Sequence, residues 1–138
     1  MKNVQIGTAG IVVAVVGSRG VDGEPAAGQL AAHLARLRPA LVVSGGAAGA
    51  DALAAGWARA NGVPLLELRP DYRRHGAGAT HERNRAIAER ADVVLLLWDG
   101  ASTGTLSTAR AAARLGRPCY WLLHGPPAAG PVPGGLGL

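Results

Sequence analysis

Five short apolar runs, separated by longer alanine-rich segments, constrain the fold of this chain more than any other feature. The runs cover residues 11–16, 41–43, 63–68, 93–98 and 119–123, and none of them alternates between apolar and polar positions. Continuous apolar strands are typical of parallel sheets that are covered on both faces. Between the runs, apolar residues such as Leu30, Leu34 and Leu37 recur at helical spacing. The pattern predicts an α/β protein with a Rossmann-like, doubly wound, mainly parallel five-stranded sheet and helices on both faces.

The chain length of 138 residues fits one domain. We expect the Rossmann-like domain to cover residues 11–124. Residues 1–10 would form an N-terminal extension or a short edge strand. Residues 125–138 hold nine glycines and prolines in fourteen positions, which is typical of a flexible tail.

The composition excludes several kinds of chemistry. Lys2 is the only lysine, so no internal lysine exists to hold pyridoxal phosphate or to complete a P-loop, and the formal charge of +5 comes almost wholly from arginine. Cys119 is the only cysteine, which excludes an internal disulfide and a multi-cysteine zinc site. The sequence has no signal-peptide pattern and no long apolar run, so we expect a cytoplasmic protein without a membrane partner. We also expect no metal site and no required cofactor.

Three glycine-rich turns follow predicted strands, at residues 17–20, 44–51 and 102–105. The carboxyl ends of parallel strands meet at one edge of the sheet, where ligands bind in such folds. Backbone N–H groups at a helix start attract phosphate. The same residues also have structural explanations, because glycines permit tight turns and serine or threonine hydroxyls cap helices. Asp51 could either complement a helix dipole or bind a ribose or base. The candidate ligand-binding residues at these turns are Gly17, Ser18, Arg19, Ser44, Gly45, Gly46, Gly49, Asp51, Thr103, Gly104 and Thr105.

A basic segment follows the third predicted strand. Between residues 69 and 85 five arginines oppose only Asp71 and Glu82, so the segment should attract anions. Part of it is expected to be a solvated helix face, because Arg85 and Glu89 lie four residues apart. Tyr72 is the only aromatic residue in the segment, which leaves little for nucleic-acid bases to stack on.

Taken in order, the motifs "VVGSRG", "VVSGGAAGAD", "HERNRAIAERADVVLLLWDG" and "STGT" resemble the SLOG superfamily of Rossmann-like proteins, most closely its small YspA-like members related to YpsA. The resemblance covers residues 11–123. The superfamily includes the LOG-type phosphoribohydrolases, often mislabelled lysine decarboxylases, which cleave the N-glycosidic bond of nucleoside monophosphates. It also includes the DNA-binding DprA proteins and sensors of nucleotide-derived signals.

This resemblance implies roles for particular residues. His81, Glu82 and Arg83 are similar to a His-Glu-Arg motif of the LOG type, so Arg83 would contact a phosphate or ribose, with Asn84 beside it. Gly104 and Thr105 match a Gly-Thr motif, but the glutamate expected three residues after the threonine is absent, because Thr108 stands there. The candidate catalytic set is therefore Arg83 with a relocated carboxylate, either Glu82 or Asp99.

Three hypotheses for the function follow. The first is a domain that binds a nucleotide or nucleotide-derived ligand through its glycine-rich turns, as a sensor or processing domain. The alternative is a nucleotide N-glycosidase that uses a non-standard carboxylate. The second alternative is single-stranded nucleic-acid binding, as in DprA. A homo-oligomer, a dimer or higher, is expected from the related folds.

Overall fold

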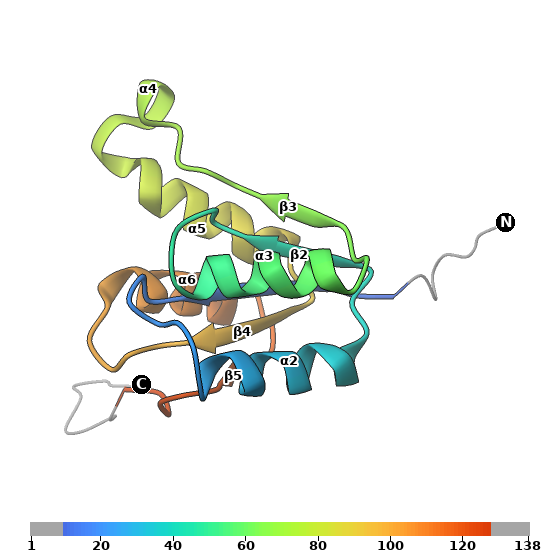
Figure 1. Cartoon of the computed structure of the whole chain (residues 1–138). Coiled ribbons are helices and arrows are strands. Elements are labelled where there is room, and N and C mark those ends of the chain that lie inside the picture. Colours follow the sequence, from blue (N-terminus) through green and yellow to red (C-terminus); the bar gives the residue numbers. More distant parts are fainter. Residues whose placement is uncertain (1–9, 128–138) are drawn as a thin grey trace, which may run out of the picture.

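The computed structural model describes residues 10–127, so almost all of the predicted N-terminal extension and residues 128–138 of the predicted tail lie outside the described residues. Strands and helices alternate along the described chain, with one excursion between the third and fourth strands (Figure 1). The elements are β1 (Val12–Gly17), α2 (Ala26–Leu37), β2 (Leu41–Ser44), α3 (Ala50–Ala60), β3 (Leu65–Glu67), α4 (Tyr72–His75), the 3-10 helix η2 (Gly76–Gly78), α5 (Ala79–Arg90), β4 (Val93–Leu97), α6 (Thr103–Arg114) and β5 (Cys119–Trp121).

The five strands form one parallel sheet in the order β3-β2-β1-β4-β5. β1 is central, with Val13 beside Val42 of β2 and Val15 beside Leu95 of β4. The predicted doubly wound α/β fold is thus confirmed, and all five strands are parallel. The edge strand β3 is shorter than the predicted run at residues 63–68, because it pairs only with β2, which itself ends at Ser44.

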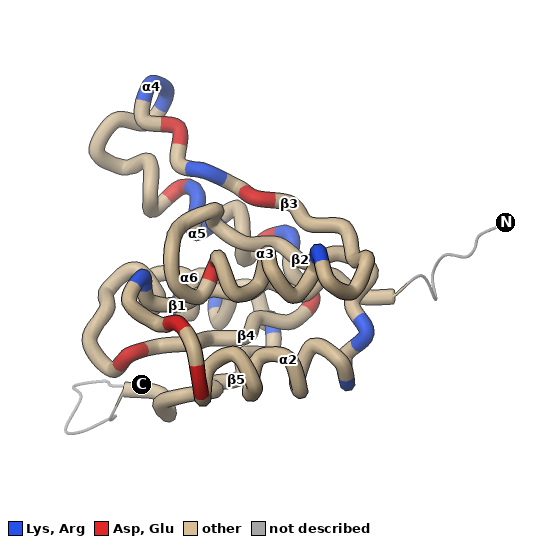
Figure 2. The backbone as a smooth tube through the Cα atoms, in the orientation of Figure 1, with Lys and Arg blue, Asp and Glu red and all other residues tan. Residues whose placement is uncertain are grey.

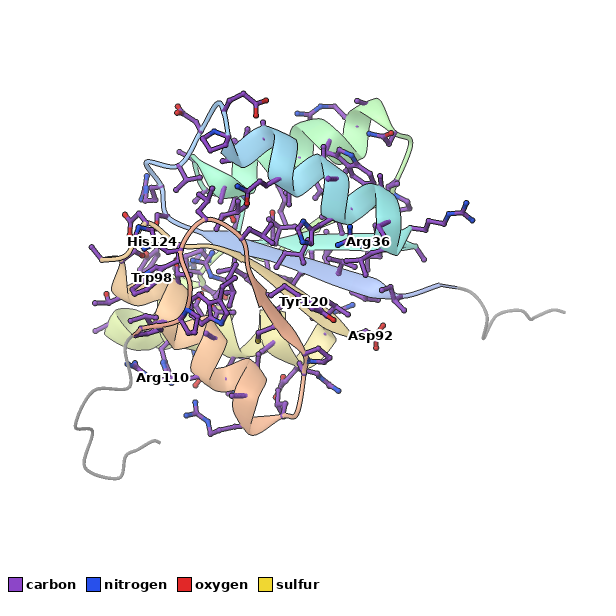
Figure 3. All side chains as sticks on the ribbon, turned by 90° about the horizontal axis from the view of Figure 1, so that it is seen from below. Arg36, Asp92, Trp98, Arg110, Tyr120 and His124 are labelled. Atoms are coloured by element: carbon purple, nitrogen blue, oxygen red, sulfur yellow. The ribbon has the colours of Figure 1, made fainter. Side chains whose placement is uncertain are left out.

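Alternate residues of the central strands face opposite layers, which explains why these strands are apolar throughout. Val13 and Val15 pack with Leu30 and Leu34 of α2 and with the alanines of α3, whereas Ala14 and Val16 pack with α5 and α6. Figure 3 shows the resulting layers, with α2 and α3 on one side of the sheet and α6 on the other. Both faces of β1 and β4 are therefore buried.

The fold leaves two places for a functional site. The strand order reverses between β1 and β4, and the loops that leave these two strands lead to helices on opposite faces of the sheet. Ligands of open parallel sheets bind at such a reversal. The second place is α4, which projects beyond the end of β3, away from the layers (Figure 1). Among residues 10–127, none of the helices is long and apolar enough to cross a membrane.

Candidate functional site

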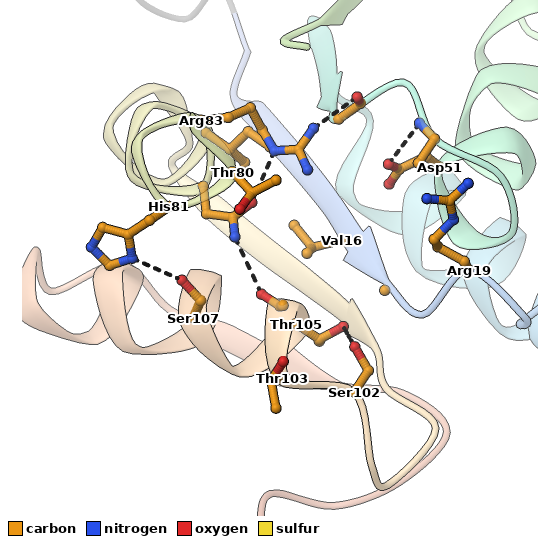
Figure 4. A pocket seen from close by; sticks show the side chains of 16 residues that line it. Val16, Arg19, Asp51, Thr80, His81, Arg83, Ser102, Thr103, Thr105 and Ser107 are labelled. Atoms are coloured by element: carbon orange, nitrogen blue, oxygen red, sulfur yellow. Dashed lines mark hydrogen bonds between the residues drawn. The ribbon is translucent and has the colours of Figure 1, made fainter. Parts of the chain in front are cut away.

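A cavity of about 510 Å³ lies at the strand reversal, above the ends of β1 and β4. Its walls come from the turn after β1, the turn after β2, one face of α5 and the first turn of α6 (Figure 4). We call it the nucleotide pocket, after the ligand that the sequence motifs predict. Its lining residues are Val16, Gly17, Arg19, Gly45, Ala47, Asp51, Thr80, His81, Arg83, Asn84, Ile87, Ser102, Thr103, Gly104, Thr105 and Ser107.

The glycine-rich turn after β2 is closed by a carboxylate of the protein itself. Oδ2 of Asp51 accepts the N–H of Ala47 at 3.0 Å, and the Oγ of Ser44 accepts the N–H of Gly46 at 3.4 Å. Two backbone donors of this turn, the N–H groups of Gly46 and Ala47, are thus already used within the described chain. The turn therefore holds a carboxylate of the protein where part of a phosphate-binding loop would hold its ligand.

Gly45 and Gly49 serve close packing in this turn. A Cβ on Gly45 would lie 2.5 Å from Nη1 of Arg83 and 3.0 Å from Oδ2 of Asp51. Gly49 has a φ of 73° and packs against the carbonyl of Arg19, so a side chain there would also face an unfavourable backbone conformation. The absence of side chains lets Arg83 and the turn after β1 approach the backbone of residues 44–51.

Arg83 forms the wall of the pocket opposite α6. Its Nη1 donates to the carbonyls of Gly45 at 2.9 Å and Leu68 at 3.1 Å, while its Nε donates to Oδ1 of Asn84 at 2.9 Å (Figure 4). Partial burial lowers the pKa of the guanidinium, and the negative charge of Asp51 opposes that effect. Arginine stays charged under these conditions because its ordinary pKa is so high. The pocket therefore contains a fixed cation.

The first turn of α6 faces the pocket with its backbone donors unused by side chains. The N-cap is Ser102, and within residues 10–127 no side chain caps this helix. The turn is held from behind, because Nε1 of Trp98 donates to the carbonyl of Ser102 at 2.9 Å and Oδ1 of Asp99 accepts the N–H groups of Ala101 and Ser102. Trp98 is in turn packed edge-on against Trp121 and against His124, which is labelled with it in Figure 3. A helix start of this kind carries partial positive charge.

Most of the sequence-predicted binding residues meet in this pocket, and some do not. Those that line it are Gly17, Arg19, Gly45, Asp51, Arg83, Asn84, Thr103, Gly104 and Thr105. Ser18 and Ser44 are buried beneath it, and the Oγ of Ser18 accepts the N–H of Asp99 at 3.1 Å. Gly46 packs under the guanidinium of Arg69. The residues outside the lining shape the turns that form the pocket.

The two carboxylates predicted to replace the missing glutamate do not line this pocket. Glu82 pairs with Arg85 at 2.7 Å on another side of α5, and this contact lowers its pKa. Asp99 is exposed, and the N–H groups of Ser102 and Ala101 that bind its carboxylate lower its pKa. Asp51 is the only carboxylate among the residues that form the pocket.

Several lining residues were missed by the sequence reasoning. Thr80 and Ile87 share the face of α5 that carries Arg83 and Asn84, at the spacing i, i+3, i+4 and i+7. Helical spacing from Arg83 would have found both. His81 and Ser107 join α5 to α6, with Nδ1 and Oγ 3.4 Å apart. Ala47 and Val16 carry no recognisable signal. No group of three or more metal-ligating side chains occurs in the part of the chain that the structure describes.

Asp51 should give the stability of the fold a pH dependence of definite sign. Burial raises its pKa above 3.8, although the N–H of Ala47 and the charge of Arg83 act in the opposite direction. The folded state thus binds this proton more tightly than the unfolded chain does, so the contribution of Asp51 is complete at low pH and is lost as the pH rises through the raised pKa.

The Asp51→Asn variant removes this titration and keeps the shape of the side chain. The unfolding free energy of the wild type, measured relative to the variant by urea denaturation, should therefore fall as the pH is raised from acid toward neutral. Glu82 and Asp99 titrate in both proteins, so their effects cancel in the difference. A wild type that gains on the variant with rising pH would contradict the assignment.

The described residues define a Rossmann-like α/β domain whose pocket lies at the topological switch point of a parallel sheet. Residues 11–75 match the YspA, cpYpsA-related SLOG family. This match confirms the relationship to the SLOG superfamily that the sequence motifs predict. No curated protein matches the chain by sequence.

Solved structures share the same fold. TM1055, a structural genomics target, is 26% identical with a TM-score of 0.62, over 79% of this chain and 72% of its own. DNA processing protein A from Helicobacter pylori, described for its single-stranded DNA binding mode, is 26% identical with a TM-score of 0.61, over 81% of this chain. The Streptococcus pneumoniae protein DprA is 24% identical with a TM-score of 0.66, also over 81% of this chain. The matched regions span 65% and 50% of these two DNA processing proteins.

Proposed function

We propose that the domain binds a nucleotide or a nucleotide-derived ligand, with a phosphate group at the first turn of α6. The observation that carries the proposal is the uncapped start of this helix, which opens into a pocket that also contains Arg19 and Arg83. Partial positive charge from the helix and full charge from the two guanidiniums favour an anion at this place.

The remaining walls suit the other parts of a nucleotide. Asn84 lies between Arg83 and α6, where its Nδ2 approaches the carbonyl of Gly104 at 3.5 Å. Val16 and Ile87 supply an apolar floor on which a sugar or base would rest. Ligand sites commonly combine such apolar surface with a few polar groups, in volumes of about 300–1,000 Å³. The pocket volume of about 510 Å³ lies within that range.

Binding is favoured over N-glycosidic cleavage because a suitable carboxylate is not in place. Glycosidic hydrolysis needs carboxyl groups beside the reacting bond. Glu82 and Asp99 lie outside the pocket lining, and the Oδ2 of Asp51 is already bound by Ala47. The single-stranded DNA binding of the H. pylori relative supports nucleotide chemistry in this superfamily, but within residues 69–85 Tyr72 is the only tyrosine, phenylalanine or tryptophan.

A thermal-shift screen of nucleoside monophosphates with the Arg19→Gln variant tests the proposal. Arg19 lines the pocket, and no carboxylate of the described chain pairs with it. Loss of its charge should weaken binding by about tenfold and reduce the ligand-induced shift accordingly. Arg110→Gln is the matched control, because Arg110 is an exposed arginine of α6 outside the pocket.

Two results would contradict the proposal. One is the absence of stabilisation of the wild type by any of the monophosphates. The other is an equal loss of the shift in the Arg19→Gln and Arg110→Gln variants, which would indicate attraction by net charge alone.

A further inference from the structure

A second cavity of about 370 Å³ lies on the other side of α5 from the nucleotide pocket. It is bounded by the segment after β3, by α4 and by the face of α5 that includes Ala79, Glu82 and Ala86. These three positions follow helical spacing, as do the pocket-facing positions on the other face of α5. We call it the arginine pocket; its lining residues are Leu68, Arg69, Asp71, Arg74, His75, Ala79, Glu82, Arg83, Arg85 and Ala86.

Not all of the charges around the arginine pocket are available to a ligand. Arg85 pairs with both Glu82 and Glu89, at 2.7 Å and 2.6 Å. Arg69 pairs with Glu67 at 3.2 Å and also donates to the carbonyl of Gly46. Arg74, unlike Arg69 and Arg85, forms no ion pair in the described part of the chain.

The guanidinium of Arg74 pairs with no carboxylate in the part of the chain described. The backbone of Arg74 is held at the start of α4, because its N–H donates to Oδ1 of Asp71 at 3.1 Å. Figure 2 shows the basic positions of this segment extending from the end of β3 to α4. Four arginines and one histidine line the cavity against two carboxylates, so it attracts anions.

Arg83 belongs to both cavities. Its Nη1 donates at once to the carbonyl of Gly45, which lines the nucleotide pocket, and to the carbonyl of Leu68, which lines the arginine pocket. Its Nη2 has no hydrogen-bond partner among the described residues. A phosphate group beside Arg83 could therefore join a ligand in one cavity to a group in the other.

We infer that the ligand is a dinucleotide, in which two nucleosides are joined through phosphate groups. One nucleoside and the first phosphate occupy the nucleotide pocket, a chain of further phosphates passes Arg83, and the last phosphate meets Arg74 in the arginine pocket. This inference rests on the proposed function. The nucleotide pocket alone, at about 510 Å³, lies within the range for a complete small ligand, so the second anion-attracting cavity is additional to what a mononucleotide needs.

A single nucleic-acid strand fits the observations less well than a dinucleotide. Strand-binding proteins combine a continuous basic groove with aromatic side chains that stack successive bases. The arginine pocket is lined by no phenylalanine, tyrosine or tryptophan and includes two carboxylates, Asp71 and Glu82. A ligand with only two nucleosides requires no such continuous platform.

Isothermal titration calorimetry with matched ligands tests the inference. The probes are AMP and GMP, the corresponding 5′,5′-linked diadenosine and diguanosine tetraphosphates, and ATP and GTP, which separate the effect of added phosphates from that of the second nucleoside. The preferred dinucleotide should bind at least about tenfold more tightly than its monophosphate, since it gains charge-assisted contacts in the arginine pocket. Arg74→Gln should weaken dinucleotide binding by roughly fivefold or more and leave monophosphate binding unchanged.

Arg73→Gln provides the control. Arg73 is the neighbouring arginine of α4 and lies outside the lining of both cavities, so this variant changes net charge equally and should weaken dinucleotide binding much less than Arg74→Gln does. Equal affinities for monophosphate and dinucleotide, or equal effects of the two substitutions, would overturn the inference and leave the proposed function standing. Failure of every probe to bind would overturn both. Affinity for oligodeoxyadenylates that keeps rising beyond two nucleotides would show a strand ligand and overturn the dinucleotide assignment.

Discussion

Replacing Gly104 by aspartate should abolish the thermal shift given by nucleoside monophosphates and leave the fold at least as stable as before. Gly104 is in the first turn of α6, and a Cβ added there would meet no atom within 4 Å. An acidic residue near a helix start is stabilising, by about 0.3–1 kcal/mol, and replacement of a helical glycine adds to this. The same carboxylate would stand where we propose the phosphate, so repulsion should lower affinity by more than about tenfold.

The Gly104→Asn variant separates charge from size. Asparagine has the shape of aspartate without its charge, so this variant should retain most of the nucleotide-induced shift. Both unfolding curves and ligand titrations are needed, because the expected changes in stability and binding have opposite signs for the aspartate variant. Equal binding by the aspartate and asparagine variants would show that no anion is bound at this helix start.

Removal of the carboxylate of Asp51 should have the largest effect on stability. Asp51 is 7% exposed, and it accepts the N–H of Ala47 and faces the charge of Arg83. In the Asp51→Ala variant the N–H of Ala47 would lose its acceptor and Arg83 would lose a nearby opposite charge, which should lower the unfolding free energy by about 1–3 kcal/mol in urea denaturation. Asp22→Ala, at an exposed position, should change it by no more than about 0.5 kcal/mol.

Rescue by an added anion makes this experiment specific. If the turn of residues 44–51 holds the carboxylate as an internal anion, the alanine variant exposes an empty site of the same chemistry. Added acetate should then stabilise the variant more than the wild type, because it binds the folded variant selectively. If Asp51→Ala fails to fold, the unfolding free energy of Asp51→Asn is compared with that of the wild type instead. This variant should fold, since its amide oxygen can still accept the N–H of Ala47. A loss no larger than that of Asp22→Ala would show that the carboxylate does not hold the turn.

The sequence was sufficient to predict the sheet. Strands such as β1 and β4 are buried on both faces, so they must be apolar at every position, and that requirement is visible without coordinates. The start of α6 was also predictable, because "STGT" follows a strand and precedes an amphipathic segment. The ends of the edge strands were less predictable, since they depend on how far the neighbouring strand continues to offer hydrogen bonds.

The roles of the acidic residues could not be read from the sequence in the same way. An aspartate at a helix start looks the same whether it caps the helix, contacts a ligand or, like Asp51, folds back onto the preceding turn. Glu82 could have been placed correctly. The face of α5 that carries Thr80, Arg83 and Ile87 at helical spacing leaves out Glu82, which lines only the arginine pocket. Asp99 depends on the path of the loop at residues 99–102, which no periodicity describes.

The projection of α4 has a kinetic consequence. Arg73 lines neither cavity, yet it stands with Arg74 and His75 on a segment that extends away from the sheet (Figure 2). Charges in such a place act on an anion before it arrives, and they influence the frequency of productive encounters more than the lifetime of the complex. The arginines of α4 would therefore mainly affect the association rate of a ligand, and Arg83 would mainly affect its dissociation rate. Salt would lower the association rate by screening the charges of α4. It would change the dissociation rate less, because the guanidinium of Arg83 is half-buried.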